Sequence, residues 1–70
     1  KLRKLTSPAS ISNLVVVGDF EGYVHLLNAQ SGNFEGREKV SRNAITEIIS
    51  KGNYLLIADS AGRVQKFSIK

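Results

Sequence analysis

The sequence repeats itself with an offset of 40 residues, and this repeat restricts the fold more than any other feature. Residues 13–30, NLVVVGDFEGYVHLLNAQ, align without a gap with residues 53–70, NYLLIADSAGRVQKFSIK. Extending the alignment back to residue 6 gives six identities: Thr6, Ser10, Asn13, Asp19, Gly22 and Val24 match Thr46, Ser50, Asn53, Asp59, Gly62 and Val64. Every aligned pair across residues 14–18 keeps apolar character. A gapless match of turn residues and apolar runs indicates two copies of one structural unit.

Each unit has the pattern of short β-strands. The runs 14–17 and 54–57 are apolar, contain β-branched or aromatic residues and are bounded by Asn, Gly and Asp. The expected strands are 9–11, 14–17, 23–29 and 34–40 in the first unit and 45–50, 54–57 and 63–69 in the second. A helix is disfavoured because no segment of about 11 residues or more shows a helical apolar stripe. Pro8 and six glycines also interrupt the chain.

About 40 residues per four-stranded unit is the period of a β-propeller blade. Strands that are apolar on both faces fit that fold, because each blade packs between two neighbours. We therefore predict an all-β fold of antiparallel blades, with residues 1–40 as one four-stranded blade and residues 41–70 as the final blade, which lacks its outer strand. Two blades do not close a propeller. Together with Lys1 in first place and no Met anywhere, this leads us to expect a fragment of a longer protein.

The segments DFEG and DSAG, residues 19–22 and 59–62, have the composition of tight hairpin loops. An Asp at the first position accepts from a backbone N–H two residues on, and a Gly at the fourth position takes positive φ without steric cost. We expect each segment to join the second and third strands of its unit. The structural turn residues are then Asp19, Gly22, Asp59 and Gly62.

No motif for catalysis, a cofactor or a metal is recognisable. A calcium loop needs acidic or amide residues at alternate positions and a Glu at the twelfth, and the second unit replaces Glu21 with Ala61. The spacing of Gly18 and Gly22 does not fit a dinucleotide fingerprint, and a phosphate loop would need Gly-Lys-Ser/Thr. His25 is the only histidine, and we expect it to satisfy its nitrogens locally. We assign no partner-binding residue.

The composition disfavours several further classes of partner and site. The net charge of +4 comes from basic residues scattered among acids, with no interleaved aromatic motif, so we expect no nucleic-acid partner. The chain has no cysteine, which excludes disulfides and thiolate zinc sites within it. No apolar run approaches the roughly 20 residues of a membrane span.

The residues of the repeat also resemble those of a known family. Residues 7–32, SPASISNLVVVGDFEGYVHLLNAQSG, resemble the repeat of quinoprotein-dehydrogenase-like propellers: a Ser-Pro strand, an apolar strand, a Gly-containing corner, and an apolar strand ending in Asn-Ala before Ser-Gly. Within that superfamily, GDFEGYVH is most similar to the outer-membrane protein assembly factors. Residues 52–69, GNYLLIADSAGRVQKFSI, resemble the C-terminal end of those proteins.

The resemblance implies an eight-bladed lipoprotein at the periplasmic face of the outer membrane of a Gram-negative bacterium, held there by an N-terminal lipid anchor absent here. Such a protein binds the barrel-forming subunit of the assembly machinery and acts as a scaffold without catalysis or cofactor. Its N-terminus supplies the missing outer strand of the last blade. The alternative is a fragment of a quinoprotein dehydrogenase. It is disfavoured because the Trp that usually follows Gly-Lys-x-x in that repeat is absent and this chain has Gly36 there.

The two-blade architecture also predicts how the isolated chain behaves. A blade face that lacks its neighbour and a strand edge that lacks a partner both favour association. We expect the isolated chain to self-associate, and one route is the lending of a strand between copies.

Overall fold

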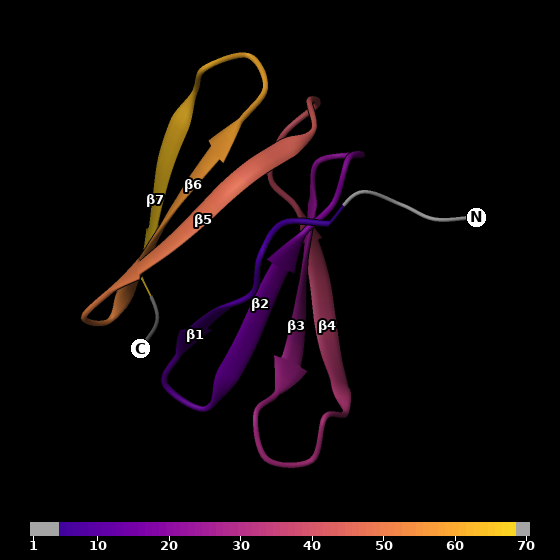
Figure 1. Ribbon diagram of the computed structural model, residues 1–70, viewed down its shortest axis with the longest axis vertical. Coiled ribbons are helices and arrows are strands. Elements are labelled where there is room, and N and C mark those ends of the chain that lie inside the picture. The colour runs from indigo at the N-terminus through magenta and orange to yellow at the C-terminus, as the bar shows by residue number, and fades with distance from the viewer. Residues whose placement is uncertain (1–4, 69–70) are drawn as a thin grey trace.

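The chain folds into two antiparallel β-sheets that lie side by side, in a computed structural model that describes residues 5–68 (Figure 1). Each strand pairs with the next along the chain, so both sheets are simple meanders. The first sheet contains β1 (Ala9–Ile11), β2 (Leu14–Gly18), β3 (Tyr23–Asn28) and β4 (Phe34–Lys39). The second contains β5 (Ile45–Lys51), β6 (Tyr54–Asp59) and β7 (Val64–Ser68).

This architecture confirms the predicted all-β fold of antiparallel blades. Every strand expected from the sequence is present, and its ends agree to within two residues. Ile69, the last residue of the expected strand 63–69, lies outside the described residues. Within residues 5–68, no helix is long and apolar enough to cross a membrane.

The sequence repeat is preserved in the register of the strands. Leu14 pairs with Asn28 in the first sheet, and Tyr54 pairs with Ser68 in the second. At the other end of the same strands, Gly18 pairs with Val24 and Ala58 with Val64. Each pair in the second sheet follows its counterpart by 40 positions, since 54 − 14 and 58 − 18 both equal 40. The two sheets are therefore two copies of one hairpin arrangement.

The hydrophobic core lies between the two sheets. Its fully buried members alternate along the strands, as expected where one face of a sheet is covered. They are Ile11, Val16 and Val24 from the first sheet and Ile45, Ile48, Leu55 and Ile57 from the second. The side chains that point to the outer faces are only half-buried, for example Val17 and Leu56. Strands that are apolar on both faces thus bury one face here, because each sheet has a single neighbour.

Close backbone packing sets the distance between the sheets. A Cβ added to Gly18 would overlap the side chain of Ile45, so β5 approaches β2 more closely than a larger residue would allow. The Ile45 N–H donates to the Asp19 carbonyl at 2.9 Å. On the neighbouring strands, the Ser50 hydroxyl donates to the Ser10 carbonyl at 2.7 Å. These contacts hold β5 of the second sheet against β1 and β2 of the first.

Candidate functional site

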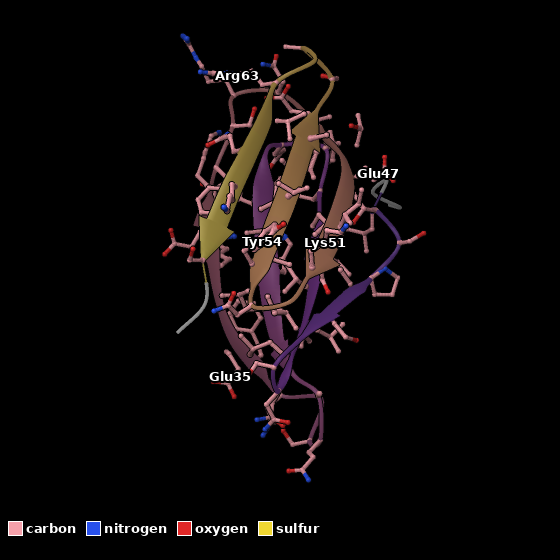
Figure 2. All side chains as sticks on the ribbon, turned by 90° about the vertical axis from the view of Figure 1, so that its left-hand side faces the viewer. Glu35, Glu47, Lys51, Tyr54 and Arg63 are labelled. Atoms are coloured by element: carbon pink, nitrogen blue, oxygen red, sulfur yellow. The ribbon has the colours of Figure 1, made fainter. Side chains whose placement is uncertain are left out.

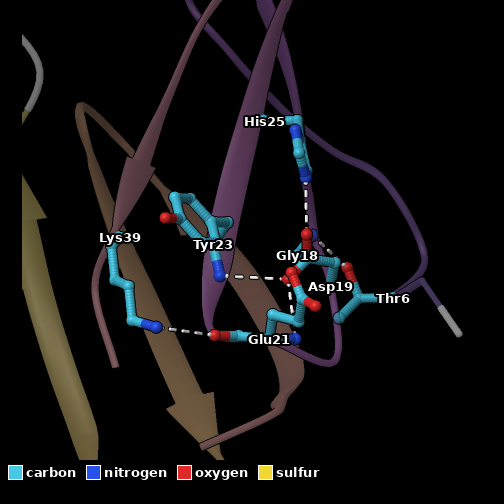
Figure 3. A network of polar contacts seen from close by, with 7 residues as sticks. All are labelled: Thr6, Gly18, Asp19, Glu21, Tyr23, His25 and Lys39. Atoms are coloured by element: carbon cyan, nitrogen blue, oxygen red, sulfur yellow. Dashed lines mark hydrogen bonds and ion pairs between the residues drawn. The ribbon is translucent and has the colours of Figure 1, made fainter. Parts of the chain in front are cut away.

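The corner between β2 and β3 is built around a buried aspartate (Figure 3). Asp19 is only 4% exposed, and its Oδ1 accepts hydrogen bonds from the main-chain N–H of Glu21 at 2.9 Å and of Tyr23 at 3.1 Å. The Gly22 N–H donates to the Asp19 carbonyl at 3.3 Å, and Gly22 has a φ of 92°. Glycine adopts that left-handed conformation without steric cost. One carboxylate oxygen and one glycine therefore close the hairpin.

The second carboxylate oxygen of Asp19 contacts His25 on β3. His25 Nε2 lies 2.7 Å from Asp19 Oδ2, and the imidazole ring lies 6.5 Å from the ring centroids of both Tyr23 and Phe34. Burial raises the pKa of Asp19. The hydrogen bonds from His25 and from the backbone of Tyr23 and Glu21 lower the pKa by more than burial raises it, so it lies below its ordinary value. Asp19 is thus ionised at neutral pH and has a partner on each oxygen.

The corner between β6 and β7 repeats this geometry around Asp59, which is 5% exposed. Its Oδ1 accepts from the main-chain N–H groups of Ala61 and Arg63, both at 3.0 Å, and Gly62 has a φ of 87°. Its Oδ2 accepts a 2.6 Å hydrogen bond from the Ser41 hydroxyl. That bond is the largest influence on the pKa of Asp59 and lowers it, the backbone N–H groups of Arg63 and Ala61 add to the effect, and burial opposes it.

The two corners differ in the side chain that completes them. Gln65 occupies the position of His25 one repeat later, but its amide donates to the Val40 carbonyl at 2.7 Å and not to Asp59. Ser41, which serves Asp59 instead, lies in the connection between the sheets. Sequence reasoning missed both carboxylate partners. The exchange of His for Gln at matching repeat positions was the one signal that the two corners are completed differently.

The first corner also anchors the connection between the two sheets. The Gly22 carbonyl accepts from the main-chain N–H of Val40 at 2.9 Å and of Ser41 at 3.2 Å. A Cβ at Gly22 would overlap the Ser41 carbonyl oxygen, whereas a Cβ at Gly62 would meet nothing within 4 Å. Gly22 therefore serves two purposes, the bend of its own hairpin and the close approach of the connection. Gly62 serves only the bend.

A threonine earlier in each repeat supports the corner. The Thr6 N–H donates to the Gly18 carbonyl at 2.9 Å, and Thr6 Oγ1 accepts from the Gly18 N–H at 3.0 Å. One repeat later, Thr46 Oγ1 donates to the Ala58 carbonyl at 3.2 Å. Both threonines thus bind the residue that precedes the corner aspartate, which explains their place among the identities of the repeat.

The chemistry available at these corners is structural. Asp19 and Asp59 are buried, and every oxygen of their carboxylates accepts a hydrogen bond from the protein, so both groups hold the corners together. The Ser41 hydroxyl donates to a carboxylate and not to a histidine, so it is not arranged as an activated nucleophile. Among residues 5–68, no group of three His, Cys, Asp or Glu side chains lies close enough to hold a metal ion.

The described residues also border two open hollows and a small cationic cluster. One hollow of about 380 Å³ lies beside Phe20 and the β5 end, and another of about 310 Å³ lies between the sheets beside Val24 and Phe67.

On the outer face of the first sheet, Arg37 and Lys39 lie 4.9 Å and 5.2 Å from the Tyr23 ring centroid. Lys39 Nζ also donates to the Glu21 carbonyl at 3.3 Å.

The chain is similar in sequence to several known proteins. No known protein-family profile matches the chain. The chain is 38% identical over 69 residues to the outer membrane protein assembly factor BamB of Pseudomonas aeruginosa, a match covering 97% of this chain and 18% of that protein. The same factor of Escherichia coli is 40% identical over 63 residues, with 89% and 16% covered. That of Marinobacter adhaerens is 34% identical over 71 residues, with 97% and 18% covered.

The chain belongs to the BamB family. These matches confirm the resemblance drawn from GDFEGYVH to the outer-membrane assembly factors. The chain spans 16 to 18% of the length of these BamB relatives.

A solved structure supports the fold independently. The crystal structure of the computationally designed Ika4 protein superimposes with a TM-score of 0.78 over 94% of this chain and 41% of the designed chain. The two sequences are 21% identical, so the similarity speaks for the fold alone.

Proposed function

We propose that this chain is a non-catalytic segment of a BamB-type scaffold that supports the folding and insertion of outer-membrane β-barrels. The observation that carries the proposal is the match along 97% of the chain to a protein named as an outer membrane protein assembly factor. The site geometry supports it, because the polar groups of both corners are engaged in holding strands and the inter-sheet connection. The relatives are named as assembly factors and not as enzymes. No observation favours the quinoprotein dehydrogenase alternative.

The proposal includes the place of the chain in the longer protein. Residues 1–40 form one blade and residues 41–70 the last blade of an eight-bladed propeller, whose outer strand comes from another part of the same protein. Two observations support this division: the sheets are related by the sequence repeat, and the second has three strands within the described residues where the first has four. The corner residues Asp19, Gly22, Asp59 and Gly62 then have the same structural role in both blades.

The full-length protein is proposed to act at the periplasmic face of the outer membrane of a Gram-negative bacterium. A lipid anchor on its N-terminal part holds it there, and the barrel-forming subunit of the assembly machinery is its partner. The support is the name shared by the relatives and the family membership of the chain.

A segment exchange tests the proposal. In Escherichia coli BamB, the region that matches this chain over 63 residues is replaced with the matching residues of this chain, and the chimera is expressed in a strain that lacks the factor. We expect the chimera to restore the amount of folded outer-membrane β-barrel protein and to co-purify with the barrel-forming subunit.

The matched control is the same chimera with Gly22→Val, which places a branched side chain against the Ser41 carbonyl. We expect this control to lose the restored function. A chimera that accumulates at the normal level but restores neither barrel assembly nor partner binding would contradict the proposal.

A further inference from the structure

Each sheet of the chain has one outer face that nothing covers within residues 5–68. The first-sheet outer face consists of half-buried side chains on β2 and β3, namely Val15, Val17, Tyr23, His25 and Leu27, with Arg37 and Lys39 of β4 beside them. The second-sheet outer face is turned toward the viewer in Figure 2. It consists of Glu47, Ile49 and Lys51 on β5, Tyr54, Leu56 and Ala58 on β6, and Val64 and Lys66 on β7. Of these, Ile49 is 44% and Val64 is 64% exposed. The centre of each face is apolar, and charged side chains lie beside it: Arg37 and Lys39 on the first face, and Glu47, Lys51 and Lys66 on the second.

The sequence repeat relates these outer faces to the faces that form the core. Adding 40 to a residue number converts the inner face of the first sheet into the second-sheet outer face: Leu14, Val16, Gly18, Val24 and Leu26 become Tyr54, Leu56, Ala58, Val64 and Lys66. The same shift converts the first-sheet outer face into the inner face of the second sheet: Val15, Val17, His25 and Leu27 become Leu55, Ile57, Gln65 and Phe67. The two outer faces are therefore counterparts of two surfaces that already pack together.

We propose that a second copy of this chain places its first-sheet outer face on the second-sheet outer face of the first copy. This contact continues the joint between the sheets from one molecule to the next. The occupant is a second copy because it carries, by the repeat, the surface that matches the joint inside the chain. The proposal concerns the 70-residue chain itself and stands apart from its role in barrel assembly.

The close contact at the centre of the joint shows the complementarity. Inside the chain, the β-branched Ile45 lies against Gly18, where even a Cβ would overlap its Cγ2. In the contact between copies, Ala58 takes the place of Gly18 and Leu5 takes the place of Ile45. Leu5 has no branch at Cβ, which leaves room for the methyl group of Ala58. Leu5 is 58% exposed in the single chain and would be covered.

Polar groups match in the same way. The hydrogen bond from the Ser50 hydroxyl to the Ser10 carbonyl has a counterpart between copies, from the Ser10 hydroxyl of the second copy to the Ser50 carbonyl of the first. Lys66 replaces an inner-face leucine, but its Nζ lies 4.5 Å from the Tyr54 ring centroid, so its stem extends along the apolar face. The amine thus reaches an aromatic ring and does not stand isolated in the contact.

The contact joins two different faces, so it is heterologous and copies add head to tail until a ring closes. This geometry has a signature that a two-fold dimer lacks. Val15→Lys blocks only the first-sheet outer face. Leu56→Glu blocks only the second-sheet outer face and places a carboxylate opposite Lys66 on the neighbouring strand, which preserves the sheet. Gln30→Asp, in the exposed β3–β4 turn, is the matched control.

Light scattering coupled to size exclusion measures the outcome. We expect the wild type and Gln30→Asp to have a mass several times the 7.6 kDa of one chain. Each face variant alone should fall to the monomer mass. An equimolar mixture of Val15→Lys and Leu56→Glu should give a dimer of about twice that mass and nothing larger, because one intact face of each kind remains. Circular dichroism confirms that each variant keeps its sheets, and Leu27→Lys with Val64→Glu serves as a second pair.

Four results would overturn the proposal. A wild type that stays monomeric at millimolar concentration removes the contact. Loss of association in one variant only would show a two-fold contact between like faces. Association that persists in both variants would show that copies exchange strands at the edge of β7 instead. A mixture of two folded monomeric variants that does not form the dimer would likewise exclude the head-to-tail contact.

Discussion

Ser50 donates a 2.7 Å hydrogen bond to the carbonyl of Ser10, the residue that occupies its own position one repeat earlier. The bond lies between the adjacent strands β5 and β1, so the second sheet is placed by contact with the part of the first sheet that it repeats. Thr6 and Thr46 also match by the repeat, and each hydrogen-bonds within its own unit, to Gly18 and Ala58. The two sheets are thus related by the sequence repeat and contact each other through a pair of equivalent residues.

Removal of the Ser50 hydroxyl should weaken the joint without disturbing either sheet. We expect Ser50→Ala to lower the free energy of unfolding by about 0.5–1.5 kcal/mol, the usual net value of a neutral hydrogen bond. Urea denaturation at a fixed protein concentration measures the change, because association alters apparent stability. Ser7→Ala, in an exposed loop, is the control, and an equal loss in both variants would argue against the joint.

The glycines of the two corners should respond differently to the same substitution. Gly22 and Gly62 have similar φ values of 92° and 87°, so an added Cβ causes about 1 kcal/mol of backbone strain at either site. Only at Gly22 does the Cβ also meet the Ser41 carbonyl. We therefore expect Gly22→Ala to cost about 1–3 kcal/mol more than Gly62→Ala in urea unfolding. Equal costs would mean that the connection between the sheets moves away freely.

The Asp19 carboxylate predicts a dependence of stability on acidity. Its pKa in the folded chain lies below the ordinary value that it has when unfolded. A carboxyl group of this kind stabilises the fold above its unfolded pKa, near 4, and the contribution is lost as the pH falls through the folded pKa. We expect Asp19→Asn to be destabilised at pH 7 and to approach the wild type below pH 4.

Unfolding in urea at a series of pH values tests this expectation. Glu47→Gln, at an exposed carboxylate, is the matched control and should follow the wild type throughout. A stability difference between Asp19→Asn and the wild type that stays constant from pH 7 down to about pH 2 would show that the carboxylate is not responsible.

The strands and corners could be predicted from the sequence because their signals are local. Short apolar runs, and an Asp followed by a Gly three positions later, determine a hairpin from within a few residues. The partners of the corner aspartates could not be predicted in this way. His25 reaches Asp19 across a hairpin, whereas Ser41 reaches Asp59 from the connection between the sheets. That second contact depends on how the sheets pack, which no short stretch of sequence encodes.

The same limit applies to the burial of the strands. Residues 14–17 are apolar throughout, and the sequence suggested cover on both faces, yet Val16 is fully buried while its neighbours are half-buried. The apolar pattern indicates which faces of a strand can be buried. Each sheet has a single neighbouring sheet here, so only one of those faces is buried. The half-buried outer faces are for this reason the places where the chain is expected to meet its own copies.

The contact between Gly18 and Ile45 gives the sharpest test of the distance between the sheets. Gly18→Ala adds a methyl group that would overlap the Ile45 side chain, so we expect a loss of about 1–3 kcal/mol in the free energy of unfolding. Ile45→Leu moves the branch away from Cβ and should recover part of that loss in the double variant, although alone it disturbs the core. A double-mutant cycle measured in urea gives the coupling between the two sites. A coupling near zero would contradict the contact, since independent sites give additive losses.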